Sequence, residues 1–275
     1  MWERRKLAAI VFTALYYKAT AKLLDMAPDA VDDMYEGCHQ QAMEKFIKLG
    51  LLKQELNSSK GFQKAWSTST HGCSPVIPGG IKEHTTALLA YFNGDVDFIK
   101  PFNKDVERLG VNVSTYEEDF HFKSLHFLLM DSLRLLNPKT CSTLYVLSEE
   151  SYTAKKGSKV RFGSFTTVYS SYKKVKKMED LDGQVILNIT SCFFATLRDC
   201  TEYKDVVLLS PTEVFTVDEV NKKSDADDSE YTEIVLTHSK MDSLHNCYIF
   251  SRAPADVSTQ WLVLVFVVLS LFFFN

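Results

Sequence analysis

The sequence predicts an α+β fold, in which a helical N-terminal part is followed by a mainly antiparallel β-sheet core. Up to Asn137, apolar residues recur at three- and four-residue steps, as they do on the buried face of a helix. After Thr140, short runs rich in β-branched and aromatic residues replace this pattern. Helices first and strands afterwards, without an internal repeat or a break in composition, indicate one α+β domain within the 275 residues.

Helical structure is expected in three stretches of the first half of the chain, the first of them as surface helices with one buried face. The three stretches cover residues 22–56, 83–92 and 114–137. The stretch 57–82 is rich in Ser, Gly and Pro and is predicted to be a loop with Trp66 as an anchor. The third helix has the strongest signal, because Ser114 and Glu117 form a capping box and Pro138 follows the end of the apolar stripe.

Seven strands are expected after Thr140. They cover residues 142–147, 159–171, 184–189, 206–209, 213–217, 231–238 and 247–251, with a polar loop at 221–229. A charged run follows the second of these strands, and we interpret it as a solvated hairpin or loop without a function of its own; it consists of Lys173, Lys174, Lys176 and Lys177. The formal net charge is −4, whereas a nucleic-acid-binding domain carries a basic patch or stripe, so no nucleic-acid partner is expected.

Both ends of the chain have the layout of export signals. Residues 1–21 combine a charged start, a short apolar run from Leu7 to Tyr17 and small residues, which predicts a signal peptide that is removed. A buried N-terminal helix is the alternative, and the other end of the chain disfavours it. There, the apolar run Trp261–Phe274 is shorter than the roughly 17 to 25 residues of a spanning helix.

The C-terminal run follows a polar spacer and several small residues, which is the arrangement of a GPI-attachment signal. We expect attachment at Ser251 or Ala253 and removal of residues 252–275. The domain 22–251 would then lie on the extracellular face of the plasma membrane, held by a lipid anchor, or be secreted where the signal is not used. Three glycosylation acceptors suit this compartment, at Asn57, Asn112 and Asn188.

Six cysteines lie between the two terminal segments, an even number that suits up to three disulfides in an oxidising compartment. Their spacing alone leaves the pairing open. A metal site is the rival interpretation, but no pair has Cys-x-x-Cys spacing. His84 is expected to be a partly exposed helix residue, and His121 and His126 are five residues apart and lie on different helix faces. No metal is expected.

Three segments resemble a known family. They are 116–129 (Tyr-Glu-Glu-Asp-Phe-His-Phe-Lys-Ser-Leu-His-Phe-Leu-Leu), 160–166 (Val-Arg-Phe-Gly-Ser-Phe-Thr) and 207–215 (Val-Leu-Leu-Ser-Pro-Thr-Glu-Val-Phe). In this order and spacing they resemble the vertebrate ecto-ADP-ribosyltransferases, secreted or GPI-anchored enzymes that transfer ADP-ribose from NAD to arginine side chains. The resemblance covers about residues 23–250. It implies a split pair of sheets around an NAD cleft and disulfides Cys38–Cys247 and Cys141–Cys192, with Cys73 and Cys200 left as a third pair.

The resemblance also implies which side chains the cleft needs. Cleavage of the nicotinamide–ribose bond develops positive charge on the ribose, which a carboxylate stabilises. A second acid two residues earlier activates the arginine acceptor, an Arg holds the dinucleotide phosphates and a Ser braces the site. The four positions are Val146 for the Arg, Thr167 for the Ser, and Lys204 and Val206 for the two acids. The sequence therefore predicts impaired or absent catalysis.

NAD is the co-substrate that the resemblance implies, and the residues expected to contact it are Tyr145, Val146, Phe165 and Thr167. Loss of one preorganised stabiliser of developing charge costs about 10²- to 10³-fold in rate, so the substitutions predict very little transfer. The favoured hypothesis is an inactive family member that acts as a binding or surface-recognition protein outside the cell.

Two alternatives stay open. The first is a working NAD–arginine transferase or NAD glycohydrolase, with a cell-surface protein as arginine acceptor, that uses a displaced carboxylate such as Asp205. A one-residue shift in a strand moves a side chain to the opposite face, so Asp205 would need a β-bulge to reach the cleft. The second is an adhesion module that needs no cleft.

Overall fold

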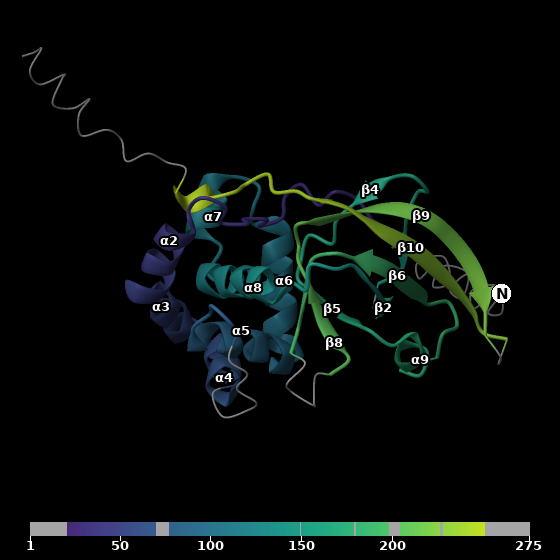
Figure 1. Cartoon of the computed structure of the whole chain (residues 1–275), viewed down its shortest axis with the longest axis horizontal. Coiled ribbons are helices and arrows are strands. Elements are labelled where there is room, and N and C mark those ends of the chain that lie inside the picture. Colours follow the sequence, from purple (N-terminus) through teal and green to yellow (C-terminus); the bar gives the residue numbers. More distant parts are fainter. Residues whose placement is uncertain are drawn as a thin grey trace, which may run out of the picture.

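The computed structural model describes residues 21–69, 77–148, 150–178, 180–197, 204–225 and 228–250. The helices gather in one half of the molecule and the main sheet in the other half (Figure 1). Residues 1–20 and 251–275, which hold the predicted signal peptide and the predicted GPI signal, lie outside the described residues. Within the described part, no helix is long and apolar enough to cross a membrane.

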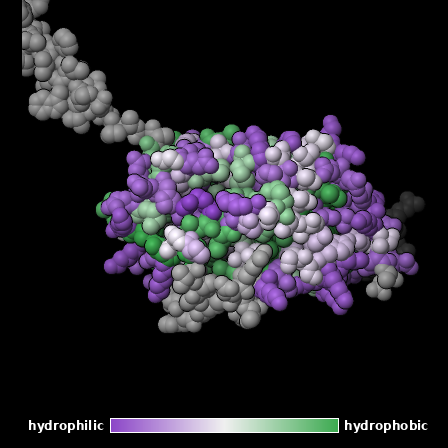
Figure 2. Space-filling view, viewed as in Figure 1, coloured by the Kyte–Doolittle hydropathy of each residue, from purple (hydrophilic) through white to green (hydrophobic). Residues whose placement is uncertain are grey.

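The helical half is built around α8 (Lys123–Leu136), whose residues from Lys123 to Leu133 are all buried. The other helical elements are α2 (His39–Ala42), the π-helical turn η1 (Met43–Lys48), α3 (Leu51–Ser58), α4 (Lys60–Ser69), α5 (Lys82–Asn93), α6 (Val96–Arg108) and α7 (Val113–Glu118). Fully buried aromatic rings fill the space between them, including Phe46, Phe62, Phe102 and Phe127. Hydrophobic residues also reach the surface mainly over this half (Figure 2).

The prediction of helix over residues 22–56 is wrong for its first part, because helical structure begins only at His39. Residues 24–38 form a loop. The Asp25 and Asp33 carboxylates each accept the backbone N–H of the residue two positions further on, both at 2.7 Å. Such local side-chain bonds offer the backbone an alternative to the helix, which explains why the apolar spacing is overridden here.

In the helical half, two helices lie where the sequence patterns predict none; in the sheet half, the short helix α9 (Tyr172–Val175) replaces part of the hairpin or loop expected at the lysine run. The helix α4 occupies part of the predicted loop 57–82, and α6 follows α5 after a two-residue connection. In both, apolar side chains at three- or four-residue steps face the core: Phe62 and Ala65 in α4, and Phe98, Phe102 and Val106 in α6. A glycine near the start of α4 and Pro101 inside α6 weaken the helical signal in the sequence.

The predicted helix 114–137 is two helices, α7 and α8, with a break between them. The first is capped by Asn112 rather than by the predicted capping box. The second is capped by Glu55 of α3, whose carboxylate accepts the first two backbone N–H groups of α8 at 2.8 and 2.9 Å. The predicted helix 83–92 is confirmed as α5.

The histidines of the helical half have structural roles. His84 is buried, not partly exposed as expected. Its Nδ1 accepts a backbone N–H, so its Nε2 carries the proton and donates to Asp131 at 2.9 Å. His126 donates from Nε2 to the Val31 carbonyl (2.9 Å) and accepts the Tyr35 hydroxyl at Nδ1 (2.9 Å). Burial lowers the pKa of His126 to about 4, so this side chain is neutral at neutral pH.

The main sheet has eight strands in the order β4-β9-β10-β6-β2-β5-β8-β7, and every neighbouring pair is antiparallel except β10 with β6. The strands are β2 (Ser142–Ser148), β4 (Lys159–Val160), β5 (Thr166–Tyr169), β6 (Val185–Ser191), β7 (Phe194–Thr196), β8 (Val206–Leu209), β9 (Glu213–Ser224) and β10 (Glu230–Met241). A separate parallel pair joins β1 (Lys22–Leu23) to β3 (Tyr152–Thr153). The α+β class with a mainly antiparallel sheet is confirmed.

Three strand predictions need correction. The expected strand 159–171 is split into β4 and β5, because residues 161–165 leave the ladder. Gly163 in this segment has a φ of +71°, and a Cβ there would lie 2.4 Å from the Ala27 Cβ, so only glycine fits. The strand expected at 247–251 is absent within the described residues, where a 3₁₀ turn, η3 (Tyr248–Phe250), takes its place. The predicted loop 221–229 begins later, since β9 continues to Ser224.

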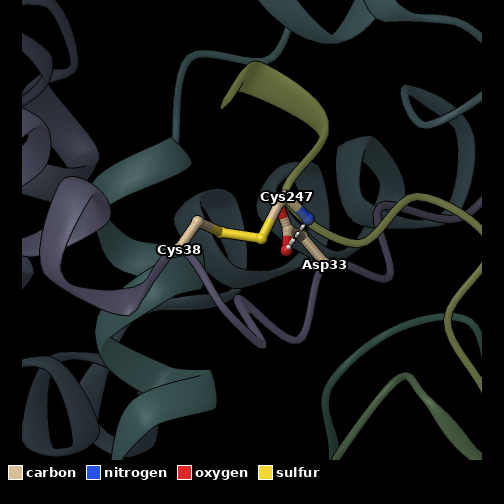
Figure 3. A group of neighbouring side chains, drawn as sticks. All are labelled: Asp33, Cys38 and Cys247. Atoms are coloured by element: carbon tan, nitrogen blue, oxygen red, sulfur yellow. Dashed lines mark hydrogen bonds between the residues drawn. A yellow bond between two sulfur atoms is a disulfide. The ribbon is translucent and has the colours of Figure 1, made fainter. Parts of the chain in front are cut away.

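Within the part of the chain that the structure describes, two disulfides are present, with the pairings that the resemblance implies. Cys38–Cys247 joins residues 209 positions apart, and Cys141–Cys192 joins residues 51 positions apart. The suggested pair Cys73–Cys200 lies outside the described residues. Asp33 lies beside the first disulfide and accepts the Cys247 N–H at 2.8 Å (Figure 3). Because both sulfurs of this cluster are bonded to each other, the cluster is not a metal site.

Candidate active-site cleft

A cavity opens where two neighbouring strands separate. β2 and β5 share a single ladder pair, Tyr145 with Tyr169, and diverge beyond it. The cavity between the diverging strands and the helices α5 and α6 has a volume of about 830 Å³. This size suits a nucleotide-sized ligand, since ligand pockets occupy roughly 300–1,000 Å³.

The wall formed by α5 and α6 is held by a short chain of hydrogen bonds. The Tyr91 hydroxyl donates to the Phe165 carbonyl at 2.7 Å and accepts the Asn103 amide at 3.0 Å. Burial raises the pKa of Tyr91 to about 12, which keeps the hydroxyl protonated as a donor. Asn103 lies at the cavity wall, and its Oδ1 is buried without a hydrogen-bond partner among the described residues.

Charged side chains of α6 follow the cavity at helical spacing. Lys100, Lys104 and Arg108 are four residues apart along one face of the helix and line the cavity. The lining carboxylates, Glu107 and Glu150, are both bound by Lys22, at 3.1 and 3.7 Å. Lys22 offsets one of these two negative charges, and the three α6 cations outnumber the remaining one, so the cleft has a net positive charge that favours an anionic ligand.

Three of the four residues expected to contact NAD line the cavity: Val146, Phe165 and Thr167. Val146 is half-buried and presents an apolar side chain where the family's Arg is expected. Tyr145 does not line the cavity and packs instead on the Tyr172 ring, with 4.9 Å between the centroids. The helical residues Tyr91 and Asn103 were missed by the sequence analysis, although the four-residue apolar spacing in α6 was a signal for that helix.

The positions expected for the two acids are not acidic and do not line the cavity. Lys204 is exposed in the turn before β8, and Val206 is the first residue of that strand. Val206 of β8 is paired with Tyr169 of β5, and two residues along the same ladder Leu208 of β8 is paired with Thr167 of β5. Paired residues on adjacent strands project to the same side of a sheet. Val206 therefore lies on the same side as Thr167, next to an aromatic ring.

Asp205 lies on the other side of this ladder. The register between β5 and β8 is continuous from Leu209 to Val206, without a bulge, and the Ser170 N–H donates to the Asp205 carbonyl at 3.0 Å to extend it. Successive side chains alternate between the two faces of a strand, so Asp205 points away from the side of Val206. Its carboxylate lies 3.5 Å from the Ser170 hydroxyl.

The family model described as NAD:arginine ADP-ribosyltransferase matches residues 24–243, which is most of the chain. The chain belongs to the NAD:arginine ADP-ribosyltransferase family. It is 27% identical to ecto-ADP-ribosyltransferase 4 of the mouse, covering 90% of this chain and 85% of that protein. It is 30% identical to T-cell ecto-ADP-ribosyltransferase 1 of the rat, covering 88% of this chain and 86% of that protein.

Solved structures of the family agree with this assignment. The crystal structure of the eucaryotic mono-ADP-ribosyltransferase ART2.2 superposes with a TM-score of 0.66 at 26% identity, covering 82% of this chain and 98% of that one. A variant of the same enzyme in complex with NAD gives a TM-score of 0.64 at 27% identity, with the same coverage. Members of this transferase family thus share the fold in which the cleft between β2, β5 and α6 is found.

Proposed function

We propose that this chain is a cell-surface member of the arginine-specific ADP-ribosyltransferase family that has lost transfer activity and acts as a binding or surface-recognition protein. The observation that carries the proposal is the side of the sheet next to Thr167. There the strand β8 presents Val206, while the nearest carboxylate in sequence, Asp205, points to the opposite face. No negative charge from β8 is then available to stabilise a developing ribosyl cation.

The phosphate-binding position supports the same proposal. Val146 has no donor to replace the guanidinium that the family uses, and an apolar side chain in the cleft wall contributes nothing to binding a pyrophosphate. A missing acid and a missing phosphate clamp act on one reaction, so their effects are not additive. Even the smaller of the two losses lowers the rate by about 10²-fold.

The residues present nevertheless fit an anionic nucleotide as a ligand. Lys104 and Arg108 line the cavity as exposed cations, and the half-buried Phe162 offers part of an aromatic ring at its wall. Cations and aromatic walls bind phosphates and bases without any chemistry. The cleft thus suits binding of NAD or a related nucleotide, and it lacks the groups for transfer.

The rival proposal is an active transferase or NAD glycohydrolase in which Asp205 replaces the missing acid. It needs a rearrangement of the first residues of β8, because the ladder places Asp205 against Ser170. An arginine on an extracellular protein would be the acceptor. The position of Asp205 at the end of a strand is the feature that favours this alternative, since strand ends rearrange at a smaller cost than strand centres.

The cell-surface placement is part of the proposal. It is supported by the relatives, among them the mouse GPI-linked NAD(P)(+)–arginine ADP-ribosyltransferase 1, which is 28% identical over 90% of this chain and 84% of that protein. We propose removal of residues 1–21, glycosylation at Asn57, Asn112 and Asn188, and lipid attachment at Ser251 or Ala253. Mass spectrometry of the mature chain from the membrane of expressing cells tests all of these assignments together.

One experiment separates the proposals. The purified chain and its Asp205→Asn variant are incubated with labelled NAD and an arginine acceptor, and NAD binding is measured in parallel by equilibrium dialysis. We expect no turnover by either protein above the buffer rate. Turnover that depends on Asp205 would contradict the proposal. Saturable NAD binding without turnover would argue against an adhesion module that needs no cleft.

A further inference from the structure

A dense group of cations lies on the sheet half, away from the cleft wall of α6. The short helix α9 (Tyr172–Val175) and the turn after it carry four lysines, here called the lysine patch: Lys173, Lys174, Lys176 and Lys177. Val175 is fully buried where α9 packs against β2 and β5, and Ser171 caps the helix. The patch is therefore fixed on a packed element at the lower edge of the sheet half, where the surface is hydrophilic (Figures 1 and 2).

Tyrosine rings hold two of the ammonium groups in place. Lys174 Nζ lies 5.1 Å from the centre of the Tyr169 ring. Lys176 Nζ lies 5.5 Å from the Tyr231 ring and 5.8 Å from the Tyr172 ring. A cation within about 6 Å of an aromatic face is attracted to the ring. The ring carries no net charge, so the ammonium group keeps its positive charge. The outer side of each ammonium group stays available to an anion.

Three carboxylates close to the lysine patch are hydrogen-bonded to other groups. Asp180 accepts the Asp182 N–H at 3.1 Å and the Ser229 hydroxyl at 3.4 Å. Glu233 is buried and binds Lys223 at 2.5 Å and the Tyr172 hydroxyl at 3.0 Å. The Asp205 carboxylate faces Ser170. In the described part of the chain, none of the four lysines forms an ion pair with a carboxylate. Four positive charges within five residues thus have no described carboxylate bound to them, on a chain whose net charge is −4.

We infer that the lysine patch binds a sulfated glycan. Two lysine pairs on either side of the buried Val175 match a linear polyanion with closely spaced charges, and lysine-rich segments of this length are typical of heparin-binding surfaces. A membrane is disfavoured as the partner, because Val175 of α9 points inward and the exposed Met178 beside the patch is a single side chain, too small an apolar face to insert. The choice of a glycan over a nucleic acid rests on the proposed extracellular placement of the chain. The inference that the patch binds a polyanion rests on the geometry of the lysines and is independent of that placement.

The test uses the full chain, purified in mild detergent, on immobilised heparin. A matched pair of variants removes two exposed lysines each: Lys173→Gln with Lys177→Gln in the patch, and Lys53→Gln with Lys60→Gln on α3 and α4. Both pairs change the net charge equally, so a loss confined to the first pair reports on the patch. We expect the patch variant to lose on the order of tenfold in affinity and its slope of log affinity against log salt to fall by about two.

Competition by soluble ligands identifies the ligand class. Heparin should release the bound chain, and chemically desulfated heparin, duplex DNA and vesicles of anionic phospholipid should not do so at equal charge. Equal losses in the two variant pairs would overturn the inference, and so would stronger competition by DNA or vesicles than by heparin. Because NAD turnover is not measured, this outcome is independent of the proposal for the cleft.

Discussion

Val206 and Tyr169 are paired neighbours in the ladder between β5 and β8. The position that the family resemblance assigns to the carboxylate is therefore an apolar side chain beside an aromatic ring. A positive charge that develops on a ribose near this pair would gain no electrostatic stabilisation from it. Under the proposed function, the chain keeps the family fold, which depends on backbone pairing and burial, without the family chemistry.

Restoring the family's side chains should restore transfer. In a variant with Val146→Arg, Thr167→Ser, Lys204→Glu and Val206→Glu, we expect arginine ADP-ribosylation at least about 10²-fold above the native chain, because a charge stabiliser and a phosphate clamp return together. The matched control carries the first three changes only. Equal rates for the two variants, measured with labelled NAD, would contradict the role assigned to position 206.

Arg161 should be essential for stability although it does not line the cleft. Its guanidinium donates to the buried Asp32 carboxylate at 2.7 Å and to the carbonyls of Met26, Ala27 and Asp242 at 2.8 to 3.0 Å. Replacing Arg161 by Lys leaves several of these buried acceptors unpaired, so we expect a loss of about 3 kcal/mol in the free energy of unfolding.

Urea unfolding measures this loss, and Arg108→Lys is the control. Arg108 is exposed and forms no ion pair among the described residues, so its change should stay within about 0.5 kcal/mol. A loss below about 1 kcal/mol for Arg161→Lys would show that lysine satisfies the same carbonyls.

Glu55 should make the fold less stable as the pH rises through the weakly acidic range. Burial raises the pKa of Glu55 to about 7, and the backbone N–H groups of Ser124 and Lys123 oppose the rise only partly. The folded state then binds a proton more tightly than the unfolded state, whose pKa is about 4.5. This stabilisation is fully present below pH 4.5 and is lost as the pH rises to about 7.

The comparison of the native chain with Glu55→Gln isolates this effect. Between pH 4.5 and 7 we expect the native chain to lose up to about 3 kcal/mol relative to the variant, which carries no titrating group at this position. Parallel pH profiles of unfolding free energy for the two proteins would contradict the prediction. Asp33, whose pKa burial raises to about 6, titrates in both proteins and cancels in the difference.

The two disulfides should differ in their contribution to stability. Cys38–Cys247 closes a sequence separation of 209 residues and Cys141–Cys192 one of 51, so loop entropy favours the first by about 1 kcal/mol. Replacing each pair by serine and measuring denaturant unfolding compares them. Asp33 and the Asn246–Glu36 hydrogen bonds keep the C-terminal segment attached, so we expect the first variant to fold. A larger loss from the second pair would contradict the entropic ranking.

The sequence predicts the parts of this fold that local patterns control. The strands β2, β6 and β8 are where the apolar runs place them, because each is buried on the inner side of one sheet. The start of α8 is different, since its cap is Glu55, a residue 68 positions away from the helix start that it binds. No local pattern contains that contact, which is why the break between α7 and α8 was missed.

The cleft also contains residues that local sequence motifs predict and residues that they do not. Val146, Phe165 and Thr167 could be placed in it from the family motifs, which lie on strands with a clear register. Asn103 and the α6 cations could not, because Pro101 hid the helix that carries them. The opposite orientation of Asp205 follows from the alternation of side chains along β8 once the ladder is known to lack a bulge.

The most direct test of the central claim is single-turnover transfer with the native chain in excess over labelled NAD. Excess protein compensates for weak NAD binding, so the measured rate constant reports the chemical step alone. The rat T-cell relative serves as the family reference under the same conditions. We predict that the native chain and its Asp205→Asn variant both give the rate of protein-free buffer. A rate above buffer for the native chain that Asp205→Asn abolishes would contradict the account.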